Sequence, residues 1–234
     1  MNRAISAADL RIGGFVPFST VDFPGAISAV VFCQGCSLRC AYCHNPNLLD
    51  PSRATSLRWA DIKKKLEARR GLVDAVVFSG GEPLLQRALP VAIKAAKSMG
   101  FKVALHTAGA APIRLESIVR DLDWVGFDLK AQFSRYGALT GAPRGGQNAR
   151  RSLAILAASG VSFEVRTTAW PGFHDPDDVA ELARCAKAAR AGAFVIQQAR
   201  DPVSRRPVAS PFFSDPSTVA GLRGEFPFLT LRPA

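Results

Sequence analysis

Three closely spaced cysteines are the residues of this chain whose type and spacing could do chemistry. Cys36, Cys40 and Cys43 form a Cys-x3-Cys-x2-Cys run inside the stretch FCQGCSLRCAYCHNP. Iron–sulfur clusters that only carry electrons are usually held by four cysteines. Three thiolates can instead bind three irons of a four-iron cluster and leave the fourth iron without a protein ligand. An open coordination position is where a substrate or cofactor can bind a metal. The spacing therefore predicts a site where chemistry takes place at a metal cluster.

A structural zinc site is the main alternative for the same loop. Cys33 and His44 flank the run and could complete a tetrahedral ligand set. A zinc knob usually takes its second ligand pair from a distant segment, and the sequence offers no such pair. Cys185 stands alone in an alanine-rich stretch, and we expect it to be a small buried residue of a helix. The absence of a secretion signal favours a reducing compartment over a disulfide framework.

The elements that must position this loop alternate between strand and helix. Short β-branched or apolar runs predict strands at 27–32, 75–78, 102–105, 124–127, 161–166 and 194–196. Helices are predicted at 57–69 with Ser56 as cap, at 86–99 before Gly100, at 112–120, at 149–159 before Gly160, and at 176–190, ending near Gly192.

Six successive βα units predict an α/β fold with a parallel sheet and right-handed crossovers. No glycine-rich dinucleotide fingerprint follows the first strand, and a closed barrel needs eight units. We therefore expect a partial, open (β/α)6 barrel of the TIM type.

Polar and glycine-rich segments follow each predicted strand. The cysteine loop follows the first strand; the others are SGGEP at 79–83, HTAG at 106–109, Asp128 with Lys130, RTT at 166–168, and Gln197 with Gln198. In α/β barrels the chemistry lies at the carboxyl ends of the strands. We expect these six segments to meet at one rim and form the site.

Composition and the terminal segments bound the class of protein. The chain has 234 residues, 48% of them hydrophobic, and we expect a single domain with its core at about 26–198 and a C-terminal extension, 200–234, whose role stays open. The first residues, MNRAISAADLRIGG, lack the apolar core of a signal peptide, and no apolar run is long enough to span a bilayer. A cytoplasmic protein without a membrane partner is expected.

The formal net charge of +11 raises the question of nucleic acid. The densest basic stretch, Lys63 to Lys65 with Arg69 and Arg70, falls on one predicted helix that also carries regularly spaced apolar residues. A solvated helix face explains that pattern better than a nucleic-acid surface. No nucleic-acid partner is expected, and an acidic protein partner stays open.

The cysteine run and the SGGEP segment together resemble the radical S-adenosylmethionine (SAM) superfamily, whose signature is Cys-x3-Cys-x-aromatic-Cys; Tyr42 supplies the aromatic residue. Three segments narrow the resemblance: GGFVPFSTVDFPG at 13–25, FCQGC at 32–36 and CHNP at 43–46. They are similar to the glycyl-radical enzyme activating enzymes, and among these to the anaerobic ribonucleoside-triphosphate reductase activating proteins of the longer type. The similarity extends from about residue 13 to about residue 198.

The resemblance implies one [4Fe–4S] cluster bound by Cys36, Cys40 and Cys43, with SAM chelating the open iron. Cys33 is left outside this ligand set as a packing residue. The segment Gly80, Gly81, Glu82 and Pro83 looks like the motif that receives the methionine amino group of SAM. Its glycines would allow close backbone approach, and a carbonyl or carboxylate would pair with the ammonium. An ordinary strand-to-helix turn is the alternative interpretation.

The resemblance also implies SAM contacts on the later strands. Asp128 and Lys130 resemble an Asp-x-Lys motif in which the lysine neutralises the methionine carboxylate; a surface ion pair is the alternative. Arg166 resembles an arginine that faces SAM, although it could instead pair with an acidic neighbour such as Glu164. His106 stands where related enzymes carry aspartate, which puts a monovalent-cation site in doubt. It could contact the cofactor or be a histidine satisfied within the rim.

The reaction implied is reductive cleavage of SAM to methionine and a 5′-deoxyadenosyl radical, which takes a hydrogen atom from a glycine of a partner enzyme. No side chain need act as a general base, because the cluster and SAM carry the chemistry. The expected partners are a glycyl-radical enzyme, most closely anaerobic ribonucleotide reductase, and an external reductant such as flavodoxin. Residues 47–59 contain no cysteine, so no ferredoxin-like insertion is expected. The alternatives are activation of pyruvate formate-lyase, or a small-molecule reaction similar to that of 7-carboxy-7-deazaguanine synthase.

Overall fold

A computed structural model describes residues 4–234. The first three residues of the N-terminal segment, for which the sequence predicts no signal peptide, lie outside the described part. The chain divides into two compact units, Met1–Ser37 with Asn45–Val125 and Leu38–His44 with Gly126–Ala234. The boundary passes through the cysteine loop, so Cys36 belongs to the first unit and both Cys40 and Cys43 belong to the second. Organisation as a single domain stays a prediction. None of the described helices is both long and apolar enough to cross a membrane.

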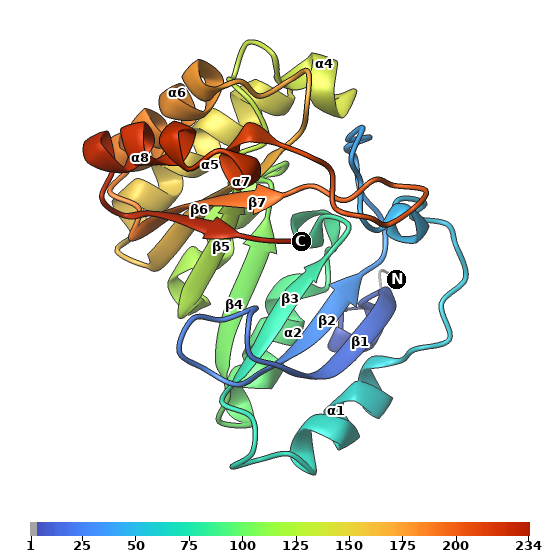
Figure 1. Cartoon of the computed structure of the whole chain (residues 1–234). Helices are drawn as coiled ribbons and strands as arrows, with labels where there is room; N and C mark the ends of the chain where they lie inside the picture. The colour runs from blue at the N-terminus through green and yellow to red at the C-terminus, as the bar shows by residue number, and fades with distance from the viewer. Residues whose placement is uncertain (1–3) are drawn as a thin grey trace. The chain divides into compact units, whose positions relative to one another are not determined.

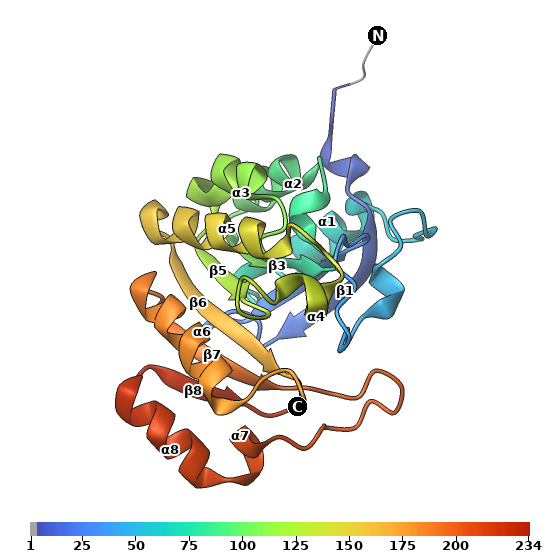
Figure 2. The same ribbon diagram turned by 90° about the horizontal axis from the view of Figure 1, so that it is seen from above.

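The first unit is a sheet covered by helices (Figure 1). Its strands are β1 (Ile12–Ser19), β2 (Ser28–Cys33), β3 (Ala75–Gly80), β4 (Lys102–Thr107) and the start of β5 (Trp124–Asp128). The pairs β2–β3 and β3–β4 are parallel, whereas β1 runs antiparallel to β2. The helices are α1 (Trp59–Glu67), α2 (Leu89–Ser98) and α3 (Pro112–Ile118), and Figure 2 shows α2 and α3 on the same side of β3.

One buried cluster in this unit explains why the segment at 20–27 folds back onto the strands. Phe23 packs with Val30 of β2, Val77 of β3 and Ala104 of β4. Its ring stacks on Trp124 with a centroid distance of 5.6 Å. Burying a phenylalanine side chain contributes about 1.5–3 kcal/mol, which offsets part of the entropy lost when this segment is ordered.

The second unit continues with the end of β5, followed by β6 (Ser162–Ala169), β7 (Ala193–Gln198) and β8 (Leu229–Arg232). The pairs β6–β7 and β7–β8 are parallel. Its helices are α4 (Tyr136–Thr140), α5 (Gly145–Ser159), α6 (Pro176–Ala188), α7 (Pro211–Ser214) and α8 (Pro216–Glu225). Asp175 caps α6 by accepting a hydrogen bond from the Asp178 amide at 2.8 Å, and Gly160 ends α5 in the left-handed conformation.

Strand neighbours follow the sequence order from β1 to β8. The prediction of an open, mostly parallel α/β sheet is therefore confirmed. β1 lies outside the six predicted strands and is antiparallel to β2; its glycines and proline give no strand pattern. The prediction also lacks the four-residue strand β8 and the short helices α4 and α7, which are too brief to show an apolar period. It lacks α8 because the sequence of that helix, PSTVAGLRGE, has few large apolar residues.

Several helix starts differ from the prediction for local reasons. Ser56 does not cap α1; the helix begins after Arg58, which makes no side-chain cap. The helix expected from residue 86 begins at Leu89, because Pro83 first opens a short 3-10 turn capped by Glu82. Cys185 lies on α6 as expected, but it is half-buried and not part of the core.

Candidate active site

Close backbone approach explains both glycines at the end of β3. Gly80 has φ of +115°, a conformation that side-chain-bearing residues rarely adopt. A Cβ at Gly80 would also collide with the Cys33 backbone, and one at Gly81 would collide with the Gly35 carbonyl. The Gly81 and Glu82 amides donate to the carbonyls of Cys33 and Gly35, each at 2.9 Å. The segment is therefore fastened directly to the start of the cysteine loop.

The Glu82 carboxylate accepts hydrogen bonds from other residues of the first unit. The residue is 1% exposed, and its side chain accepts hydrogen bonds from the Leu84 amide at 3.1 Å, Thr107 Oγ1 at 2.6 Å and the Ala108 amide at 2.9 Å. These bonds tie the end of β3 to the end of β4. The prediction that this segment receives an ammonium group therefore depends on its backbone carbonyls more than on the carboxylate.

Side chains and backbone also hold the first part of the cysteine loop. Gln34 Nε2 donates to the carbonyls of Asn47 at 3.0 Å and Asp50 at 2.7 Å. The Cys36 amide donates to the Leu49 carbonyl at 3.0 Å. Cys33, at the end of β2, is fully buried, and burial followed by the nearby Glu82 charge raises the pKa of its thiol. A protonated, buried thiol agrees with a packing role, which nevertheless stays a prediction.

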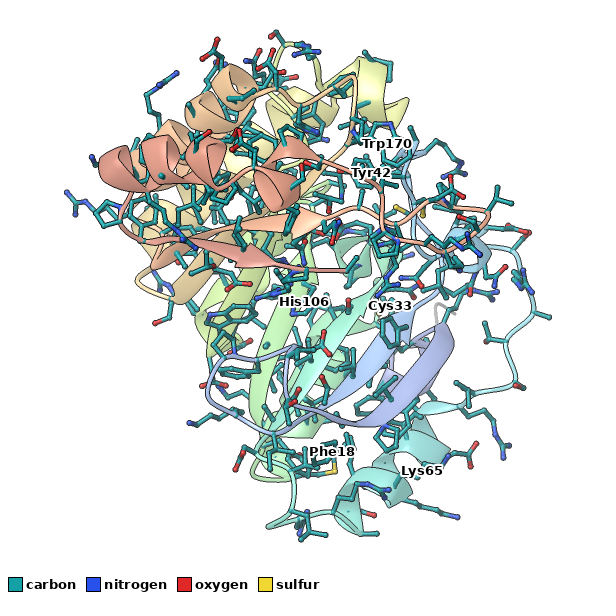
Figure 3. All side chains as sticks on the ribbon, viewed as in Figure 1. Phe18, Cys33, Tyr42, Lys65, His106 and Trp170 are labelled. Atoms are coloured by element: carbon teal, nitrogen blue, oxygen red, sulfur yellow. The ribbon has the colours of Figure 1, made fainter. Side chains whose placement is uncertain are left out.

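His106 lies at the end of β4 and contacts the segment at 20–27 (Figure 3). Its Nε2 is 2.8 Å from the Asp22 carbonyl, and its Nδ1 is 3.8 Å from the Asp22 carboxylate. The ring also meets the edge of Trp124, with centroids 5.8 Å apart. These contacts favour the alternative of a histidine satisfied within its own unit over a cofactor ligand.

In the second unit the later part of the cysteine loop is held by α4. The amides of Arg39 and Ala41 donate to the carbonyls of Thr140 at 2.7 Å and Leu139 at 3.3 Å. Tyr42 is 4% exposed, and its ring is tilted against Trp170 with a centroid distance of 5.9 Å (Figure 3). Of the buried side-chain polar atoms in the described part of the chain, the Tyr42 hydroxyl is the one that has no hydrogen-bond partner.

Asp128, Lys130 and Arg166 form a charged cluster within the second unit. Asp128 Oδ1 is 2.8 Å from Arg166 Nε, and Asp128 Oδ2 is 3.5 Å from Lys130 Nζ. Arg166 is 5% exposed and also donates to the Gly126 carbonyl at 3.2 Å. Asp128, not Glu164, is thus the acidic partner of Arg166. Burial alone would lower the pKa of Lys130. Electrostatic interactions with Tyr42 and then with the Asp128 carboxylate outweigh burial and hold this pKa well above its usual value.

Three residues that the sequence did not single out support Lys130. The Tyr136 hydroxyl accepts from the Lys130 amide at 3.2 Å. His174 Nε2 is 2.9 Å from the Lys130 carbonyl, while its Nδ1 accepts from the Trp170 amide at 3.0 Å. Burial lowers the pKa of His174, which favours the neutral ring. Because Nδ1 accepts a hydrogen bond and Nε2 faces a carbonyl, the proton of the neutral ring is on Nε2. The turn sequence Pro171-Gly172 before His174 was the available signal, but it does not name a partner.

The chemistry of the cysteine loop fits an iron–sulfur cluster. Cys36, Cys40 and Cys43 carry half-buried thiols that form no disulfide, on one short stretch of chain. Burial raises the pKa of Cys40 and the charge of Lys130 opposes this, so iron would have to displace a proton there. Within residues 4–234 no three cysteine, histidine or acidic side chains already form a metal-ligating group. The ligand set and the SAM contacts remain predictions from the motifs.

Comparison with known proteins defines the class. The sequence pattern of the Radical SAM superfamily matches residues 30–189. Two solved structures share the fold: Streptococcus suis SuiB bound to precursor peptide SuiA (TM-score 0.70, 13% identity) and a radical SAM methyltransferase from Sphaerobacter thermophilus (TM-score 0.69, 14% identity). They are matched over 88% and 97% of this chain, which spans 48% of the first structure and 78% of the second.

Two curated relatives narrow the class. A Methanocaldococcus jannaschii protein assigned to the glycyl-radical enzyme activating enzymes is 30% identical over 196 residues, 75% of each chain. The pyruvate formate-lyase-activating enzyme of Clostridium pasteurianum is 34% identical over 184 residues, 76% of each. The chain therefore belongs to the radical SAM superfamily and, within it, to the family of glycyl-radical enzyme activating enzymes.

Proposed function

We propose that this enzyme cleaves SAM reductively at a [4Fe–4S] cluster bound by Cys36, Cys40 and Cys43, and thereby places a radical on a glycine of a partner enzyme. The observation that carries the proposal is the loop of three half-buried thiols, none of them in a disulfide, with the Cys-x3-Cys-x2-Cys spacing. When bound, the cluster and SAM would supply the electron transfer and the radical chemistry.

The residues of the chain bind, orient and exclude water in this proposal. In the first unit Gly80 and Gly81 let this segment lie directly against the backbone of Cys33 and Gly35, beside the cysteine loop, and Pro83 with Glu82 fixes the turn. In the second unit Lys130 supplies a positive charge for the methionine carboxylate, and Asp128 with Arg166 holds that lysine in place. Tyr42, within the cysteine loop, is buried against Trp170 and anchors that part of the loop in the second unit. His106 stays a weaker candidate because Asp22 already engages it.

Two kinds of similarity suggest two candidates for the glycyl-radical partner. The segments at 13–25, 32–36 and 43–46 favour anaerobic ribonucleotide reductase by resemblance. Relatives named pyruvate formate-lyase-activating enzymes, from Clostridium pasteurianum and from Escherichia coli, favour pyruvate formate-lyase instead. We propose the reductase as first candidate and the lyase as second.

The experiment mixes the reconstituted protein with SAM, dithionite and each candidate partner separately under anaerobic conditions. A glycine-centred paramagnetic signal with the reductase supports the proposal, and one with the lyase alone moves the assignment to the second candidate. SAM cleavage without a signal from either partner would favour the small-molecule alternative. Stoichiometric zinc without acid-labile sulfide would overturn the cluster itself.

A further inference from the structure

A hairpin fastened to His44 is a feature that the proposed function leaves unexplained. Residues 199–208, after β7, fold back on themselves through a bridge between Arg200 and Pro207 and a hydrogen bond from the Val208 amide to the Ala199 carbonyl at 2.9 Å. The Asp201 carboxylate accepts from the amides of Val203 at 3.1 Å and Ser204 at 2.6 Å, which fixes the tip. Figure 1 shows this hairpin as the orange loop after β7.

Two contacts attach the hairpin to the residue that follows Cys43. The Arg200 amide donates to His44 Nε2 at 3.1 Å, and Arg205 Nη1 donates to the His44 carbonyl. The hairpin and this part of the cysteine loop belong to the same unit. A protein seated on the hairpin would therefore stand next to a thiol that the proposed function assigns to the cluster.

The exposed face of the hairpin is basic around an apolar tip. Arg200, Arg205 and Arg206 are all exposed, and their one acidic neighbour on the hairpin, Asp201, is already tied to the tip. Val203 is 92% exposed, the most exposed large hydrophobic residue of the described chain. A small apolar centre ringed by like charges suits a brief, electrostatically steered encounter with a partner of opposite charge.

We infer that this hairpin is the docking surface for an acidic one-electron donor protein. The inference rests on the proposed function. In each encounter the donor loses one electron and the iron–sulfur centre gains it, and no atom is transferred. The charge of the hairpin raises the encounter rate, and its attachment to His44 brings the donor close to the cysteine loop.

The test uses labelled flavodoxin, titrated into the full-length reconstituted protein at low ionic strength. Arg206→Glu should weaken binding about tenfold, and the loss should shrink in about 0.5 M salt because screening weakens exposed charges. Val203→Ser should cause a smaller loss that salt does not change. Arg184→Glu on α6 makes the same change of net charge outside the hairpin and should leave affinity within about twofold of the parent.

Two readouts separate this inference from the proposed function. Dithionite needs no docking surface, so dithionite-driven SAM cleavage and iron content should be equal in parent and Arg206→Glu. If the parent protein fails to cleave SAM with dithionite, that result contradicts the proposed function and leaves the docking role of the hairpin to be judged by flavodoxin affinity. Unchanged flavodoxin affinity in Arg206→Glu would overturn the inference. So would a selective loss of affinity for the glycyl-radical enzyme, which would assign the hairpin to that partner.

Discussion

Cysteine residues in this chain occupy different environments, and those environments assign different roles to them. Cys33 is sealed at the end of β2 beside the Glu82 charge, where the thiol keeps its proton. Cys36, Cys40 and Cys43 are only half-buried and form no disulfide, as the proposed ligand role requires. Cys185 is free as well, but it stands alone on α6. The exposure of the thiols thus distinguishes the three candidate ligands from the nearby Cys33, for which we predict a packing role.

Alanine substitution tests that separation. Cys36→Ala, Cys40→Ala and Cys43→Ala should each abolish the visible colour of the reconstituted protein and its SAM cleavage, because two thiolates cannot hold the cluster. Cys33→Ala should keep substantial activity. Iron, acid-labile sulfide and absorbance measure the result, and loss of the cluster in the Cys33 variant would mean that the ligand set is wrong.

Glu82 offers a second test at the scale of one residue. Glu82→Gln would place an amide NH2 against backbone N–H donors that now bind a carboxylate, so the free energy of unfolding should fall by about 2 kcal/mol. Urea unfolding measures it. Glu67→Gln is the matched control, because the exposed Glu67 carboxylate pairs with Lys63 at 3.6 Å and such pairs contribute little. Equal stability of both variants would show that the buried hydrogen bonds of Glu82 are dispensable.

At the scale of the element, the turn after β6 stabilises the end of β5. His174 joins the Trp170 amide to the Lys130 carbonyl, which needs the neutral imidazole with its proton on Nε2. Protonation would add a proton to Nδ1, the atom that accepts from Trp170. The arrangement makes the second unit sensitive to mild acid.

The pH dependence follows from the lowered pKa of His174. Below the ordinary histidine value of about 6.5 the unfolded chain binds a proton that the folded chain resists, so stability falls as pH decreases through that range. His174→Gln should remove part of the loss between about pH 7.5 and 5.5, measured by urea unfolding at each pH. Burial also lowers the pKa of His44. The pH dependence of stability in His44→Gln, measured in the same way, therefore separates the contribution of His44 from that of His174. An unaltered pH profile in the His174 variant would contradict the prediction.

Element positions could be predicted wherever apolar spacing was long. The strands from 75 to 127 and the helices α5 and α6 follow their sequence patterns closely. The partners of buried polar groups could not be predicted, because Glu82 with Thr107, or His174 with Lys130, meet only after distant segments pack. The motifs predict which residues belong to the site, and that assignment stays a prediction. The contacts show that the side chains of Glu82 and Arg166 already have partners within their own units.

At the scale of the whole molecule, the C-terminal segment left open by the sequence is part of the second unit. β8 adds a parallel strand to β7, and Arg232 Nη2 bonds Glu164 of β6 at 3.2 Å. Phe212 and Phe226 are buried, and Lys187 of α6 lies over the Phe226 ring at 5.7 Å. The extension therefore completes the core of this unit.

Truncation tests that conclusion. A chain ending at Val208 loses β8 and both terminal helices, so it should expose β7 as a bare edge, aggregate and lose its cooperative melting transition. A chain ending at Arg232 keeps these elements and should melt within a few degrees of the parent. Thermal melting with soluble yield measures both, and a fully soluble, cooperatively folded chain ending at Val208 would refute the assignment.

The first strand has a consequence for how copies of this protein behave together. β1 is the first strand of the sheet; it pairs with β2, and its first residue, Ile12, also forms an isolated bridge with Leu57. The strand presents Val16 and Phe18 to solvent. Pro17 stands between them and has no N–H to offer. A proline in the strand disfavours continuous backbone pairing with an incoming strand, so we expect concentrated preparations to resist fibre growth along β1.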